Sequence, residues 1–235
     1  MPHKPTWENP EIEEKELLDW IRHSVQTSSN VYSHGYQGRV YLYTGKGGRK
    51  LIIKTPTGRG LMRYVRTKML EREFKAYSKL PPMDGIPRCM GFLDGLYLVL
   101  EFVEGIPIYK AEIKDHKFFF DSFLALIKKI HAEGVAHTDL KKKDNVLVVD
   151  GKKPCIIDFG VSVIKKKGFS PLNAYLYNTS RIFDFNAWVK LKYDGKYEEM
   201  SEEDSKYYHR LLIEEIARCI REPYLSIKIA LLGRK

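Results

Sequence analysis

The chain has 235 residues and a mass of 27.4 kDa, which is enough to bury a core in one domain or in two small lobes. Its net charge of +10 and isoelectric point near 9.3 indicate an anionic partner. Its three cysteines are scattered and include no CxxC pair, which argues against a zinc site and favours a reducing compartment.

The N-terminal segment lacks the apolar stretch of a secretory signal, and no window approaches the roughly 18 apolar residues that a membrane span needs. We therefore expect a cytoplasmic protein, at most peripheral at the inner face of a membrane.

Asn9 and Pro10, followed by acidic residues, predict the start of a helix over residues 11–25. Its apolar residues form a partial stripe that predicts packing against the first part of the fold: Ile12, Leu17, Trp20 and Ile21.

Two strands follow, over residues 41–43 and 51–53, with a glycine-rich hairpin turn at residues 45–48. Gly35 and Gly38 lie just before the first strand, and Val40 precedes it directly. Lys54 follows the second strand. An ordinary hairpin with an exposed lysine would explain this pattern as well as a binding loop would.

Residues 66–80 predict a helix that contains two glutamates, Glu71 and Glu73. Three apolar residues lie three, four and seven positions after Glu73: Ala76, Tyr77 and Leu80. This spacing places Glu73 on the inward face, whereas Glu71 is expected to be exposed. An apolar strand over residues 96–100 comes next, followed by a loop at residues 101–105 and an amphipathic helix over residues 117–133.

Residues 131–160 contain three motifs in a fixed order. His137-Thr138-Asp139-Leu140 comes first, Asn145 then heads an apolar run, and Asp158-Phe159-Gly160 closes a second apolar run. This order resembles the HRD-type loop, its downstream Asn and the DFG motif of the protein-kinase-like superfamily. The resemblance implies an α+β, two-lobed kinase-like fold, with a small β-rich N-lobe at residues 1–103, including the N-terminal helix, and a shortened, mainly helical C-lobe at residues 104–235.

The resemblance also implies an enzyme that uses ATP and Mg²⁺ to transfer the γ-phosphate to a hydroxyl acceptor. Asp139 would accept or orient the proton of that hydroxyl. Lys141 resembles the lysine that many serine/threonine kinases place beside the transferring phosphate. Asp158 would be the main metal ligand, since magnesium prefers oxygen ligands.

The second metal ligand has two candidates. Asn145 follows Asp139 by six positions, whereas the HRD template has five. Either the loop carries one extra residue and Asn145 keeps the role, or Asp144 takes it. We prefer Asn145 because the apolar run starts directly after it, as it does in the family.

The remaining roles carried over by the resemblance concern the nucleotide. Lys54 would pair with the phosphates and with Glu73. Gly35 and Gly38 would let the backbone approach the phosphates, and Val40 would cover the purine. The loop that contains Glu101 and Val103 resembles the hinge whose backbone binds adenine.

The chain departs from the ordinary kinase pattern after Gly160. A helix is predicted to start near Pro171, which leaves about a dozen residues for the segment that shapes a peptide platform in other kinases. Asp184 is a candidate for the buried aspartate that braces the catalytic loop. A capping-box start at Ser201 predicts a long helix to about Arg221, and the tail at residues 224–235 would complete the core or lie on an anionic membrane.

Lysine runs at residues 141–143 and 165–167 follow the two catalytic motifs. At the cleft mouth they would attract an anionic acceptor, such as a phosphorylated sugar or lipid core or an acidic protein, and nucleic acid is less favoured.

The compact layout resembles RIO-type kinases, the KEOPS-complex kinase and bacterial lipopolysaccharide-core kinases. We therefore expect an atypical serine/threonine-type or lipopolysaccharide-core sugar kinase. The alternatives are a nucleotide-binding pseudokinase scaffold and an RNA-associated kinase-like ATPase.

Overall fold

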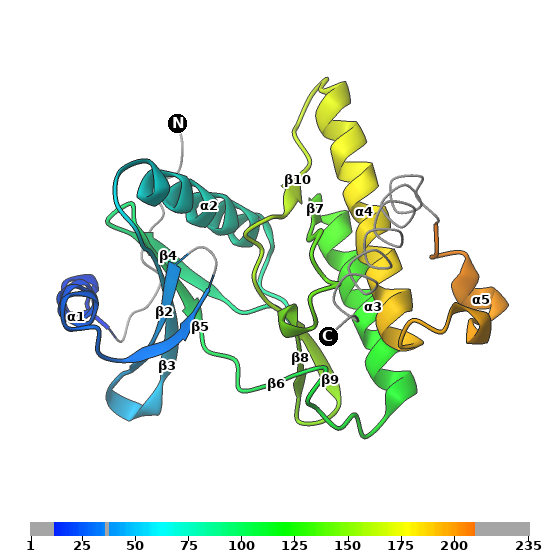
Figure 1. Ribbon diagram of the computed structural model, residues 1–235, viewed down its shortest axis with the longest axis horizontal. Coiled ribbons are helices and arrows are strands. Elements are labelled where there is room, and N and C mark those ends of the chain that lie inside the picture. The colour runs from blue at the N-terminus through cyan, green and yellow to red at the C-terminus, as the bar shows by residue number, and fades with distance from the viewer. Residues whose placement is uncertain (1–11, 36–37, 210–235) are drawn as a thin grey trace, which may run out of the picture.

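An antiparallel five-stranded sheet forms the N-lobe in the computed structural model, which describes residues 12–35 and 38–209 (Figure 1). The strands lie in the order β1-β2-β3-β5-β4. Their bounds are β1 Val31–His34, β2 Gly38–Thr44, β3 Lys50–Pro56, β4 Cys89–Leu93 and β5 Tyr97–Glu101. The predicted hairpin is confirmed: Tyr41 pairs with Ile53, and a short 3₁₀ helix, η1 Lys46–Gly48, connects the strands.

Two helices cover opposite faces of this sheet. Helix α1 (Glu14–Thr27) buries Leu17 and Ile21 against Tyr41 and Ile53 in a small core of its own, which confirms the predicted packing of the N-terminal helix. Helix α2 (Gly60–Lys79) lies on the face towards the C-lobe and buries Tyr77 in the main core. Each apolar face of the sheet therefore has its own helical cover.

Helix α2 starts six residues earlier than the sequence predicts. Its first turns are exposed, so they have no buried stripe by which periodicity could detect them. Leu61, Met62 and Arg63 are strong helix formers, and they can extend the helix without tertiary contacts over that stretch.

The C-lobe combines two long helices with short strands. Helices α3 (His116–Ala132) and α4 (Pro171–Lys192) pack together, and α4 starts where the sequence predicts. The strands are β6 Ile106–Pro107, β8 Val146–Val149 and β9 Lys153–Ile156 in one sheet, and β7 Val135–Ala136 with β10 Val163–Ile164 in another. The 3₁₀ helix η2 (Lys143–Asn145) leads directly into β8.

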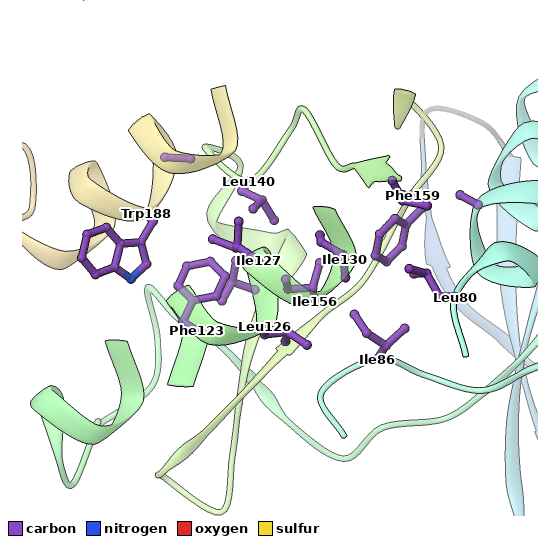
Figure 2. Close-up of a cluster of buried hydrophobic side chains, with 14 of the residues drawn as sticks. Leu80, Ile86, Phe123, Leu126, Ile127, Ile130, Leu140, Ile156, Phe159 and Trp188 are labelled. Carbon is purple, nitrogen blue, oxygen red and sulfur yellow. The ribbon is translucent and has the colours of Figure 1, made fainter. Parts of the chain in front are cut away.

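The main core joins the two lobes. Phe159 is fully buried and lies at the end of the cluster near Leu80 and Ile86, and Trp188 of α4 lies at the opposite end (Figure 2). The motif that closes the second apolar run is therefore anchored in the hydrophobic core.

The C-terminal part differs from the prediction. Ser201 caps helix α5 (Glu202–Ser205) as expected, but this helix ends after one turn, following the 3₁₀ helix η3 Tyr197–Glu199. The remainder of the predicted helix beyond residue 209 and the basic tail lie outside the described residues. Within the described part of the chain, none of the helices combines the length and apolarity that crossing a bilayer requires.

Candidate nucleotide-binding and phosphotransfer site

A cleft of about 770 Å³ lies between the lobes. Apolar side chains from both lobes line it, including Val40 of β2, Leu100 of β5 and Leu147 of β8. Charged residues from distant segments line another part of its wall, among them Lys54, Asp139 and Asp158. The cleft therefore has a hydrophobic wall and a charged wall, which suits a ligand with an apolar ring and an anionic tail.

Lys54 bridges the two lobes electrostatically. Its Nζ lies 2.7 Å from Oε1 of Glu73 and 3.3 Å from Oδ1 of Asp158. Burial lowers the pKa of Lys54, but the two carboxylates outweigh this effect and raise the pKa above its ordinary value. Glu73 is fully buried, and this burial raises the pKa of its carboxyl against the opposing effect of Lys54. The structure thus brings together the predicted lysine and glutamate.

Asp158 is held in a strained backbone conformation with φ of 69°. Burial acts to raise the pKa of its carboxyl, but the positive charges of Lys54 and Lys142 outweigh it and lower the pKa below the ordinary value. Nζ of Lys142 lies 3.8 Å from Oδ2 of Asp158. The Asp158 side chain is therefore anionic at neutral pH and flanked by two cations.

Asp139 and Asn145 form one hydrogen-bonded unit. Nδ2 of Asn145 donates to the backbone oxygen of Asp139 at 3.0 Å and to its Oδ2 at 3.2 Å. Asn145 is buried, whereas Asp144 is exposed, and both line the cleft. The extra loop residue is accommodated by η2, in which the Asn145 N–H donates to the oxygen of Lys142.

Asp184 of α4 holds the backbone of the loop that contains Asp139. Its Oδ2 accepts from the His137 N–H and its Oδ1 from the Thr138 N–H, both within 2.8 Å. His131 Nε2 also lies 2.8 Å from Oδ2. Asp184 is completely buried, so these partners provide the hydrogen bonds that a buried carboxylate requires. The predicted bracing aspartate is confirmed.

His137 connects the Asp139 loop to the turn that contains Asp158. The Asp139 N–H donates to its Nδ1, so Nε2 carries the proton and donates to the Ile157 oxygen at 3.0 Å. Phe159 packs edge-on against His137, with ring centroids 4.8 Å apart, and against Tyr77 of α2 at 4.9 Å. These contacts fix Asp139 and Asp158 relative to α2, which carries Glu73.

The β1–β2 hairpin lines the cleft with Gly35 and Gly38, which exchange two backbone hydrogen bonds across the loop. A Cβ on Gly38 would lie 1.8 Å from the Thr55 oxygen. Glycine is therefore required at this position by close packing against β3, whatever it contributes to ligand binding. At the edge between the lobes, Glu101 and Val103 also line the cleft.

The predicted lysines do not all reach the cleft. Lys142 lines the cleft, whereas Lys141 does not. The Nζ of Lys141 lies instead over the ring of Phe183 on α4, 5.8 Å from its centroid. Lys143 pairs with Asp194, and residues 165–167 are absent from the cleft wall. The prediction that the run 141–143 lies at the cleft therefore holds for Lys142, whereas the role beside the phosphate was assigned to Lys141. Sequence reasoning missed Leu147, which the strand alternation after Asn145 could have indicated.

The charged wall matches what a nucleotide-bound magnesium ion needs. No cluster of three His, Cys, Asp or Glu side chains that could hold a metal alone occurs in residues 12–35 and 38–209. Magnesium commonly takes only one or two carboxylates and completes its shell with phosphate and water oxygens. Asp158 with Asn145 or Asp144 fits that donor set.

No family model matches the chain. Curated relatives include the serine/threonine-protein kinase CHK1 of Mycosarcoma maydis, 38% identical over 85 residues, or 33% of this chain and 13% of that protein. The probable serine/threonine-protein kinase fnkB of Dictyostelium discoideum is 26% identical over 166 residues, 66% of this chain and 29% of that protein. Serine/threonine-protein kinase D of Synechocystis is 29% identical over 100 residues, 40% of this chain and 20% of that protein. The chain thus spans less than a third of the length of each.

The crystal structure of the Rio2 kinase from Chaetomium thermophilum superposes with a TM-score of 0.54 at 17% identity, covering 83% of this chain and 69% of that one. The two-lobed α+β fold predicted from the sequence is therefore confirmed. The lobes and the cleft between them agree with this result: the chain has the two-lobed fold of the Rio2 kinase, and over part of its length its sequence is similar to serine/threonine-protein kinases.

Proposed function

We propose that this protein is an ATP- and Mg²⁺-dependent phosphotransferase that moves the γ-phosphate to a hydroxyl acceptor. The observation that carries the proposal is the ion-pair chain from Glu73 through Lys54 to Asp158. It joins three segments that are far apart in sequence at one wall of the cleft, and its two carboxylates keep the lysine charged. Catalysis of phosphoryl transfer depends mainly on such positioning and charge stabilisation.

Each residue has a distinct part in this proposal. Lys54, held by Glu73, would bind the phosphates, and the hairpin with Gly35, Gly38 and Val40 would cover the nucleotide. Asp158, together with Asn145 or Asp144, would hold magnesium, which when bound neutralises charge on the phosphate oxygens. Backbone groups near Glu101 and Val103 would bind the base.

Asp139 would orient the acceptor hydroxyl and receive its proton. One of its oxygens accepts from Asn145, and this contact fixes the carboxylate in the cleft wall. The brace from Asp184 holds the backbone of the preceding residues, so Asp139 would keep its position while the acceptor binds.

The acceptor is either a serine or threonine hydroxyl or a sugar of a lipopolysaccharide core. The names of the curated relatives favour the first. The second is favoured by the short segment between Gly160 and α4, which leaves little chain for a peptide platform. Lys142 and Lys110 line the cleft and would favour an acceptor that already carries negative charge.

The test is incubation of the purified chain with γ-labelled ATP and magnesium while a casein-like protein, lipopolysaccharide core and RNA are offered in parallel. Transfer to one acceptor that requires magnesium supports the proposal and identifies the acceptor class. Thermal stabilisation by nucleotide without transfer to any acceptor would instead indicate a pseudokinase scaffold. Release of inorganic phosphate stimulated by RNA would indicate an ATPase.

A further inference from the structure

Two exposed helix ends combine apolar and basic side chains, and the cleft uses neither of them. We call residues 59–65 the α2 tip and residues 165–176 the α4 tip. In the view of Figure 1, α2 lies along the upper side of the N-lobe, and the first turn of α4 is at the top of the C-lobe.

The α4 tip exposes large apolar side chains. Their exposed fractions are Phe169 98%, Leu172 70%, Tyr175 64% and Leu176 47%. Leu172, Tyr175 and Leu176 lie at i, i+3 and i+4, so they form one continuous face of the helix. The buried residues of α4 begin only at Tyr177. The first turn and a half of α4 therefore presents an apolar face to solvent.

The α2 tip repeats this composition. Its exposed apolar residues are Leu61 78%, Met62 55%, Tyr64 60% and Val65 44%. Residues 60–65 are the part of α2 that precedes the predicted helix, and Gly58 and Arg59 lead into them.

Both tips are basic, and acidic residues are absent from long flanking stretches. Lys165, Lys166 and Lys167 belong to the α4 tip, and no Asp or Glu occurs from residue 159 to residue 183. Arg59 and Arg63 belong to the α2 tip, and no Asp or Glu occurs from residue 20 to residue 70. Each tip therefore offers positive charge next to aliphatic and aromatic side chains.

This combination fits an anionic lipid surface better than a nucleic acid. Lysine and arginine would bind acidic headgroups, while Leu61, Met62, Leu172 and Phe169 would enter the boundary between headgroups and acyl chains. Aliphatic side chains contribute little to binding a phosphodiester backbone. In the view of Figure 1 both tips lie on the upper side of the molecule, an arrangement that allows one surface to contact both.

We propose that the α2 tip and the α4 tip together form a docking site for an anionic lipid bilayer. One tip alone would bind weakly, and two tips on the same surface act as linked sites with a higher combined affinity. This docking needs neither nucleotide nor phosphotransfer, so it stands or falls independently of the proposed reaction.

The test is sedimentation of the full chain with vesicles of phosphatidylcholine alone or mixed with phosphatidylglycerol. We expect binding only to the mixed vesicles, and weaker binding at higher salt because surface charges are screened. Leu172→Ser/Leu176→Ser, Leu61→Ser/Met62→Ser and Lys166→Glu/Lys167→Glu should each weaken binding roughly tenfold.

Matched controls come from other exposed residues. Phe118→Ser on α3 removes an apolar side chain that is 49% exposed, and Lys152→Glu/Lys153→Glu reverses two lysines of the β8–β9 hairpin. Neither should change vesicle binding. All these positions are on the surface, so circular dichroism should show unchanged folding, and each tip provides a second variant if the other fails to fold.

Absence of binding to the anionic vesicles would overturn the proposal. So would binding that the tip variants leave unchanged but removal of residues 210–235 abolishes, because the tail would then carry the interaction. Tip variants that bind vesicles normally but lose capture of an acceptor protein or RNA would reassign both tips to that partner.

Discussion

The two lobes hold their charged residues by different means. In the N-lobe, Lys54 and Glu73 lie on a regular strand and a regular helix, and each is placed by the geometry of its own element. In the C-lobe, Asp139 and Asp158 lie on loops, and a buried network centred on Asp184 and His137 keeps those loops in place.

The difference shows where the precision of the site originates. A strand or helix positions a side chain through its own backbone hydrogen bonds, whereas a loop needs contacts from distant segments. Thr138 and Asp158 both have positive φ values, which the network has to maintain. Damage to Asp184 should therefore affect the whole C-lobe site, while damage to Lys54 should remain local.

The largest effect on stability is expected from Asp184→Ala. It leaves two backbone N–H groups and His131 buried without their partner, and we expect a loss of about 3–5 kcal/mol in the free energy of unfolding. Urea denaturation measures it. The control is Asp19→Ala on helix α1, whose side chain is 63% exposed and which should change stability by less than about 0.5 kcal/mol. Equal effects of the two variants would refute the bracing role.

Lys54→Met should have a smaller and local effect. It leaves Glu73 buried without its cation, and we expect a loss of about 2–3 kcal/mol, less than for a fully enclosed pair because Lys54 retains 16% exposure. Adding Glu73→Gln should recover much of this stability but none of the transfer activity. A double variant as unstable as the single one would show that the pair is not coupled.

Lys142→Ala should lower transfer about tenfold, because Lys142 lines the cleft beside Asp158. Lys141→Ala should change the rate of transfer by less than about threefold, because the wild-type ammonium lies over the ring of Phe183. Steady-state kinetics on both variants measures this contrast. The opposite order would return the phosphate-contacting role to Lys141, as the sequence pattern suggests.

The smallest effect concerns pH. The pKa of Asp158 is lowered in the folded state from an ordinary value of 3.8, so its stabilising contribution is present above that value and is lost as the pH falls through the folded pKa. From about pH 5 downwards, the wild-type free energy of unfolding should therefore fall more steeply than that of Asp158→Asn. Urea denaturation at a series of pH values measures this difference. If the free energy of unfolding fell equally steeply with pH in both proteins, the lowered pKa would be contradicted.

Much of the fold was predictable because its signals are local. The β2–β3 hairpin, the inward face that carries Glu73 and the start of α4 follow from periodicity, turn residues and a proline. The first turns of α2 were missed because exposed residues carry no periodic signal. The length of the helix after Ser201 was wrong, because a capping pattern marks where a helix starts and leaves its end undetermined.

The site was predictable in its members but less so in its geometry. Motif order identified Asp139, Asn145 and Asp158, and the structure places all three in one cleft. The direction of Lys141 was not predictable, because one extra loop residue moves Lys142 into the cleft instead. The direction of a side chain in this loop depends on the neighbouring 3₁₀ helix η2 and on contacts with α4. Helix α4 lies far away in the sequence, so these contacts have no local signal.

The most direct test of the central claim is calorimetric titration of a non-hydrolysable ATP analogue into wild type, Asp139→Ala and Asp158→Ala, with and without magnesium. If one cleft holds nucleotide and metal, Asp158→Ala loses the magnesium-dependent part of binding. Asp139→Ala keeps that part, and both variants lose transfer. Magnesium-dependent binding that survives in Asp158→Ala, or transfer that persists in either variant, would contradict the account.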